Sequence, residues 1–292
     1  MNIKTIAATA GLALSMAVTS ANAAPAFALN GGYNGEINIK FSNAESFNTP
    51  GPALGALNFG VLGISDIRNP ATNAVLWNEG TLGAELTGVF RDIKVSSIVP
   101  TGLTSINVDS TGGILDIYIN PVNSFSAVGG FSQGLGGYGA GGCAIGGACY
   151  NGISNVVGGQ LFLALQWVPG VSLTDPLATV AGNFTGATLP ATGSAQGFLK
   201  VVGGAYAANF DNNGFLSGAA DVFSQNDFCT PGQQGCDSLL SSGGPPALGG
   251  WQLRSNDPVR TAFKTVPEPG SLALLGLGLS AFGFTSKRRR RS

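Results

Sequence analysis

Short runs of alternating apolar and polar residues, separated by turn-forming residues, most limit how this chain can fold. Residues 37–41 read Ile-Asn-Ile-Lys-Phe, and this period-two alternation is typical of a strand with one buried face. Glycine supplies 46 of the 292 residues, about twice the usual ~7%, which disfavours long amphipathic helices. Together these features predict an all-β protein with a single β-sandwich or jelly-roll-like domain. Further strands are predicted at residues 74–77, 86–95, 114–119, 160–167, 198–202 and 205–210.

A glycine-rich stretch interrupts the pattern at residues 129–159, where 13 of 31 residues are glycine. Loops of this length without secondary structure are uncommon in compact domains, and they are usually either functional or disordered. We therefore predict a long surface loop, and the sequence does not distinguish between the two possibilities.

Residues 211–214, Asp-Asn-Asn-Gly, lie between the predicted strand 205–210 and an apolar run at 215–223. Asn-Gly suits the central positions of a type I′ turn, so a hairpin is predicted here. In an alternative interpretation Asp211, Asn213 and Asp221 bind calcium, but Ala220 stands where an EF-hand loop needs its last acid. Calcium binding is left open.

The first 23 residues have the features of a secretory signal peptide. Lys4 provides a positive start, residues 6–18 are apolar, and Ala21-Asn22-Ala23 forms a small-x-small cleavage site. Signal peptidase is thus a predicted partner, with cleavage after Ala23. The exported β-rich domain is predicted to span residues 24–265.

The last 27 residues combine a proline-flanked motif, an apolar segment and a run of cations. The motif is Val266-Pro267-Glu268-Pro269, and residues 271–286 are apolar enough for a short membrane helix. The cations are expected to stay on the cytoplasmic side, so the body faces outward and touches the membrane only through this helix. They are Lys287, Arg288, Arg289, Arg290 and Arg291.

This arrangement resembles the PEP-CTERM sorting signal, in which a Pro-Glu-Pro motif, a short membrane helix and an Arg-rich end follow one another. The resemblance covers residues 266–292 and implies that an exosortase, an integral-membrane cysteine protease-transpeptidase, handles the chain. It also implies transient anchoring in the inner membrane before arrival at the cell surface or in the extracellular space. Proteins of this kind are associated with exopolysaccharide, which implies a role in biofilm or floc formation.

Charge and composition exclude several classes of function. Between the two targeting segments the chain keeps 8 basic and 14 acidic residues, so nucleic acid is not an expected partner. Charged residues make up only 10% of the chain, which leaves a neutral, hydrogen-bonding exterior that suits contact with glycans. The chain has no histidine, the commonest ligand of zinc, copper and iron, and no metal or cofactor is predicted.

Two short motif matches in the glycine-rich stretch fail on chemistry. Residues 130–134 fit the Gly-x-Ser-x-Gly nucleophile elbow, but that fold needs a histidine base. Residues 134–139 fit the dinucleotide fingerprint, but no acid lies between Asp116 and Asp175 to bind a ribose. Neither match predicts an enzyme.

The four cysteines are predicted to form disulfides, because the chain is exported and their number is even. Of the three possible connectivities, the local one is favoured, since each loop is short and contains Gly or Pro. It joins Cys143 to Cys149 and Cys229 to Cys236.

From these observations we expect a non-enzymatic structural or adhesive protein of the cell exterior. A carbohydrate-binding module is an alternative, with Trp77, Trp167 or Trp251 as a platform for a sugar ring. A glycosidase is a further alternative, because glycoside hydrolysis needs two facing carboxylates. The candidate pairs are Glu79 with Glu85 and Asp109 with Asp116.

Overall fold

The computed structural model describes residues 26–49, 51–122, 158–185, 192–229, 253–256 and 258–266. Within them the chain forms one antiparallel sheet of eleven strands, so the all-β prediction is confirmed. The strands are β1 (Gly35–Phe47), β2 (Leu57–Arg68), β3 (Val75–Asn78), β4 (Ala84–Pro100), β5 (Ser105–Pro121), β6 (Gln160–Val168), β7 (Val180–Thr185), β8 (Thr192–Gly203), β9 (Val222–Cys229), β10 (Leu253–Asn256) and β11 (Val259–Phe263). The helices are α4 (Ala207–Phe210) and three 3-10 turns, η1 (Asn30–Gly32), η2 (Thr81–Gly83) and η3 (Leu216–Gly218).

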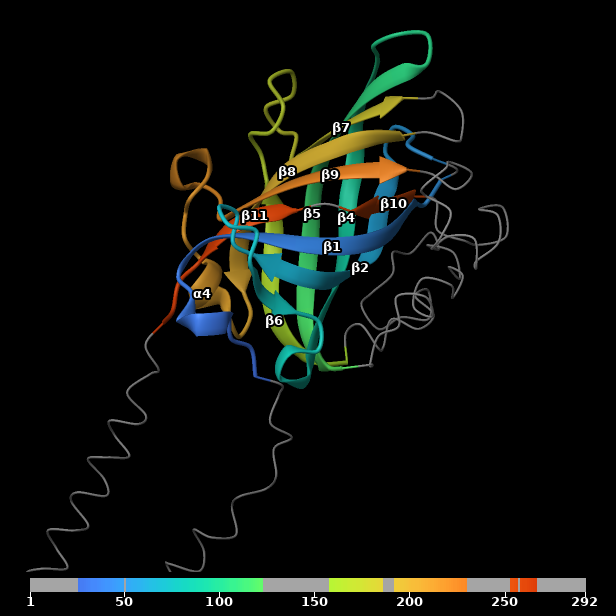
Figure 1. Ribbon diagram of the computed structural model, residues 1–292. Helices are drawn as coiled ribbons and strands as arrows, with labels where there is room; N and C mark the ends of the chain where they lie inside the picture. The colour runs from blue at the N-terminus through green and yellow to red at the C-terminus, as the bar shows by residue number, and fades with distance from the viewer. Residues whose placement is uncertain are drawn as a thin grey trace, which may run out of the picture.

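The sheet closes on itself into a barrel-like structure of eight strands (Figure 1). Going around it, the order is β1, β2, β4, β5, β6, β8, β9 and β11, and β11 pairs again with β1. Three short strands of the described chain lie outside this ring. β7 pairs with both β5 and β8, and β10 pairs with both β1 and β9. β3 pairs with β2.

The prediction of a sandwich or jelly roll is therefore replaced by a single closed sheet. Two features allow the closure. β4 and β5 have 17 residues each, and β5 is long enough to pair with β6 at one end and β7 at the other. Between these two stretches Gly112 and Gly113 have positive φ angles of 75° and 106°, a bend that only glycine adopts readily.

Six of the seven predicted strands fall in observed strands, and residues 205–210 do not. There the chain turns at Gly204, which has a φ of 107°, and forms the short helix α4. Phe210 is buried against Phe162 and Phe263, so α4 covers one end of the closed sheet. Apolar packing at this end overrides the strand-like local pattern.

The predicted hairpin around residues 211–214 is also wrong. The carboxylate of Asp221 is fully buried, and its oxygens accept hydrogen bonds from the backbone N–H groups of Asn212 (2.8 Å), Asn213 (2.6 Å) and Val201 (2.8 Å). These bonds hold residues 211–221 as a loop, and they engage the carboxylate that the calcium interpretation needed. Over the described ranges, no three His, Cys, Asp or Glu side chains are grouped to hold a metal.

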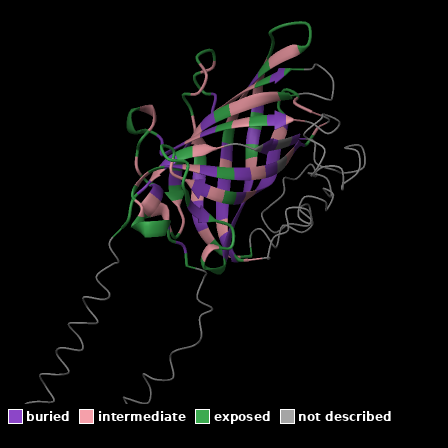
Figure 2. Cartoon of the chain, viewed as in Figure 1, coloured by how far each residue is buried: buried purple, intermediate pink, exposed green. Residues whose placement is uncertain are grey.

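Buried and more exposed residues alternate along parts of several strands, whereas β2 and β4 also contain runs of consecutive buried residues (Figure 2). The buried apolar residues form two clusters. The larger cluster contains most of the barrel residues and ends in aromatic side chains, with Phe27 packed edge-on against Phe162 at 4.8 Å. The smaller cluster comprises Phe47, Ala56, Val95, Val108, Phe184, Phe228 and Leu253.

The predicted signal peptide, the apolar segment 271–286 and residues 129–157 of the glycine-rich stretch lie outside the described residues. The boundaries of the predicted domain at residues 24 and 265 stay predictions. Within the described part, no helix has the length and apolar character needed to cross a membrane.

We expect replacement of Gly197 to destabilise the fold. A Cβ there would lie 2.8 Å from both the carbonyl oxygen of Thr179 and Cδ1 of Trp167, closer than real contacts allow. Gly197→Ala should lower the free energy of unfolding by about 1–3 kcal/mol, measured by urea denaturation. The control is Gly203→Ala on the same strand, where the new Cβ would meet only the Ala164 side chain at 3.8 Å. Equal losses in the two variants would contradict this account of the packing.

Candidate functional site

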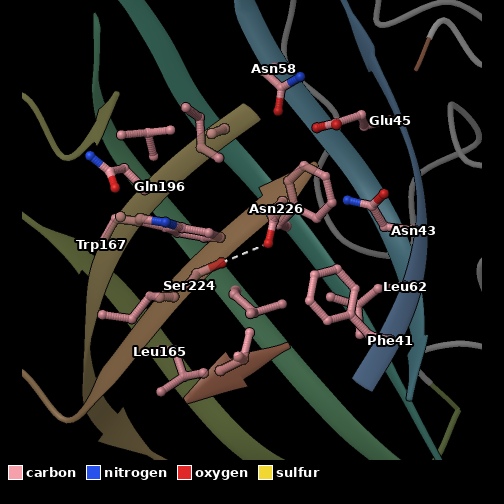
Figure 3. A pocket seen from close by; sticks show the side chains of 18 of the residues that line it. Phe41, Asn43, Glu45, Asn58, Leu62, Leu165, Trp167, Gln196, Ser224 and Asn226 are labelled. Atoms are coloured by element: carbon pink, nitrogen blue, oxygen red, sulfur yellow. Dashed lines mark hydrogen bonds between the residues drawn. The ribbon is translucent and has the colours of Figure 1, made fainter. Parts of the chain in front are cut away.

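A partly open cavity of about 130 Å³ lies inside the closed sheet and is lined by residues of both apolar clusters. Most of its wall is apolar, and every strand of the closed ring contributes to it. Figure 3 shows the wall from close by, with Trp167 on one side and Glu45, Asn43 and Asn58 across from it.

A belt of small and polar residues creates this space. Along β1 the inward residues run Phe41, Asn43, Glu45 and Phe47, so two polar side chains separate the two apolar clusters. β9 repeats the arrangement, with Val222 in one cluster, Phe228 in the other and polar residues between. We call this set the polar belt; it comprises Asn43, Glu45, Asn58, Ser110, Ser224 and Asn226.

Hydrogen bonds fix several members of the polar belt. Oδ1 of Asn43 accepts from both the backbone N–H and the hydroxyl of Ser255, each at 2.6 Å. The hydroxyl of Ser224 donates to Oδ1 of Asn226 at 3.0 Å, and these two side chains meet in the middle of Figure 3. These bonds preorganise the belt and reduce the cost of keeping it inside the sheet.

Among the described residues that line the cavity, Glu45 has the one ionisable side chain. The residue opposite it on β2 is Gly60, which leaves room for the carboxyl group and for a hydrogen bond with Asn58. Burial away from bulk water raises the pKa of Glu45 from 4.5 to about 7, and the bond with Asn58 partly opposes this shift. The carboxyl group can therefore exchange a proton near neutral pH.

Trp167 is a wall of the cavity. Its indole fits between two glycines, since a Cβ on Gly113 would lie 2.9 Å from Cε3 and one on Gly197 would lie 2.8 Å from Cδ1. The ring also meets Phe90 edge-on at 6.4 Å. Its face is thus directed by packing and lines the interior of the sheet.

The other two tryptophans predicted as sugar platforms have different positions. Trp77 is fully buried and packs against Phe27 at 6.0 Å, so its ring is part of the core. Its Nε1 has no hydrogen-bond partner within the part of the chain that the structure describes. Trp251 lies outside the described residues.

The two candidate carboxylate pairs differ in what the structure shows of them. Asp109 and Asp116 lie on β5 seven positions apart, a separation of about 20 Å at ~3.3 Å per residue, against the 5 to 10 Å that the chemistry needs. Asp116 forms an ion pair with Arg91 at 3.1 Å. In the other pair, Glu79 is exposed in a turn whereas Glu85 is buried.

Cys229 closes β9 and takes part in a disulfide bond. Cys143, Cys149 and Cys236 lie outside the described residues. The predicted pairs Cys143–Cys149 and Cys229–Cys236 stay predictions.

Among the residues of the tail, Val266 is described and is exposed, two residues after Lys264. Pro267, Glu268, Pro269 and the five cations 287–291 lie outside the described ranges. The last strand, β11, ends at Phe263, directly before this segment.

Comparison with known families identifies this segment. The PEP-CTERM protein-sorting motif matches residues 265–291. The chain carries a PEP-CTERM sorting motif. The motif indicates an exported protein that an exosortase sorts after membrane-anchored transit. No curated protein and no solved structure matches the chain.

Sequence reasoning missed the cavity, although one signal was present. On β1, Asn43 and Glu45 follow Ile37, Ile39 and Phe41 in the same period-two phase, so they had to face the same side of the sheet. When polar residues continue the inward-facing positions of an apolar strand, either the strand leaves the core there or the interior is polar at that level. The closed sheet shows that the interior is polar.

We expect Glu45 to make the stability of the fold depend on pH. Because its pKa is raised, the folded state keeps a proton that the unfolded chain has released, so stability falls as the pH rises from 4.5 through about 7. At ~1.4 kcal/mol per pH unit, the wild type should lose a few kcal/mol over this range relative to Glu45→Gln. Urea denaturation at pH 5, 6, 7 and 8 measures the difference.

The matched control is Glu36→Gln, on the same strand but exposed. It should retain the pH dependence of the wild type. If Glu45→Gln also retained it in full, the carboxyl group would have to be solvated rather than held in the cavity.

Proposed function

We propose that this protein is a non-enzymatic structural or adhesive component of the cell exterior that acts in exopolysaccharide-linked biofilm or floc formation. The observation that carries the first part of the proposal, delivery to the cell exterior, is the position of the sorting motif. It begins at residue 265, whereas β11 ends at Phe263, so a cut within the motif leaves the closed sheet complete. The proposed product is a whole folded body delivered outside the inner membrane.

The outer surface supports contact with a neutral polymer. Asn107 of β5, Asn183 of β7 and Gln225 of β9 are exposed, and each has inward-facing neighbours along its strand. Nδ2 of Asn183 donates to Oδ1 of Asn107 at 2.9 Å, so these amides lie side by side. Gln225 lies further round the sheet, with β8 between β7 and β9. We call the three residues the amide patch. Uncharged amides both donate and accept hydrogen bonds, which suits the hydroxyl groups of a polysaccharide.

The sorting step is tested by changing the motif itself. Pro267→Ala, Glu268→Ala and Pro269→Ala together should leave an uncut, membrane-held precursor, because the extended segment that a protease cleft accepts is lost. Immunoblots of membrane and medium fractions measure the product. Neutralising the five cations 287–291 should instead release or misplace uncut protein, since each cation opposes translocation. Normal processing of the triple-alanine variant would show that the motif acts as a plain anchor.

The role in the matrix is tested by deleting the gene in its host. The deletion should reduce cell aggregation and the polysaccharide that cells retain, and the wild-type gene should restore both. A variant with Asn107→Ala, Asn183→Ala and Gln225→Ala should restore less, because it lacks the amide patch. The matched control replaces exposed Glu36 and Lys40 of β1 with alanine and should restore fully. Unchanged aggregation in the deletion strain would contradict the matrix role.

A further inference from the structure

The cavity inside the sheet has the size of a small-molecule site. Its volume of about 130 Å³ is close to the ~150 Å³ of an apolar protein cavity that holds a benzene molecule. Its walls are mainly Leu, Ile, Val and Phe side chains, and Trp167 adds an aromatic face held between two glycines. Burial of an apolar ring or short chain against such walls is favourable.

The polar belt gives the cavity hydrogen-bonding groups. Asn43 already accepts two hydrogen bonds from Ser255, and Ser224 and Asn226 bond to each other. Glu45 differs from these residues, because a carboxylate can accept more bonds than the one shared with Asn58. The group best placed to meet a guest molecule is therefore an acceptor.

We propose that this cavity binds a small neutral molecule with an apolar body and one hydrogen-bond-donating end, of the phenol or short-chain alcohol class, with the donor directed at Glu45. An anionic guest is disfavoured, because the described part of the lining contains one carboxylate and no cation. This site lies inside the sheet and is separate from the amide patch on its outer surface, so it does not depend on the matrix role.

The test compares phenol with toluene, which have nearly the same shape and differ by a hydroxyl and a methyl group. Isothermal titration of the purified chain at pH 8, with ligand up to ~10 mM, should detect binding of both. Glu45→Leu keeps a similar volume and removes the acceptor. It should weaken phenol about tenfold or more, as expected for one hydrogen bond to a charged group, and leave toluene within about threefold.

Two variants show where the ligands bind and that the effect is specific. Ala195→Leu adds three carbon atoms to a residue that lines the cavity and should abolish binding of both ligands. Glu36→Leu, on the exposed face of β1, should change neither affinity. Circular dichroism of each variant checks the fold. If Ala195→Leu does not fold, melting temperatures replace it as the test of the site. Both ligands should raise the melting temperature of the wild type, and in Glu45→Leu toluene should still raise it whereas phenol should not.

Three results would overturn the proposal. The first is no binding of either ligand to the wild type, which would make the cavity a site for water. The second is equal loss of phenol and toluene in Glu45→Leu, since the carboxylate would then support the fold and not the ligand. The third is unchanged binding in a folded Ala195→Leu protein, which would place the ligands elsewhere.

Discussion

The structure depends on the backbone hydrogen bonds that join the two ends of the described chain. β1 pairs with β2 on one side and with β10 and β11 on the other, so residues 35–47 meet residues 253–263 across nearly the whole sequence. Without the pairings of β1 with β10 and β11, β1 on one side and β10 and β11 on the other would be sheet edges with unpaired N–H and C=O groups. Closure removes these edges and separates an inside from an outside. The cavity, the amide patch and the relation of the body to its tail all follow from it.

The polar belt makes the interior less stable than an apolar interior would be. A barrel interior filled with large apolar side chains would bury more apolar surface and would not hold a carboxyl group with a pKa of about 7. The chain instead places Asn43, Glu45 and Asn58 between two apolar clusters and satisfies them with hydrogen bonds. Departures from an apolar core of this kind are expected at functional sites.

The folded body and the tail have separate roles. The sorting motif at residues 265–291 indicates export and handling by an exosortase, and it says nothing about what the body does afterwards. The body ends with β11, whose pairing to β1 completes the sheet, so the motif can be handled without disturbing a strand. This separation fits a system in which one sorting signal serves folded bodies of different kinds.

The sequence alone determined the strand-forming character of the chain and the identity of its tail, because both are local patterns. Period-two alternation fixes which residues share a face, and the order of prolines, apolar segment and cations is read directly along the chain. Whether two sheets stack or one closes was not readable, since it depends on which strand pairs with β1, and its partners lie far away in the sequence. Tertiary packing turned residues 205–210 into a helix end-cap and buried Trp77, and it placed Trp167 and Glu45 across one cavity from each other. A local pattern does not predict which side chains face each other across the cavity. Their positions depend on the register of strands that pair only when the sheet closes.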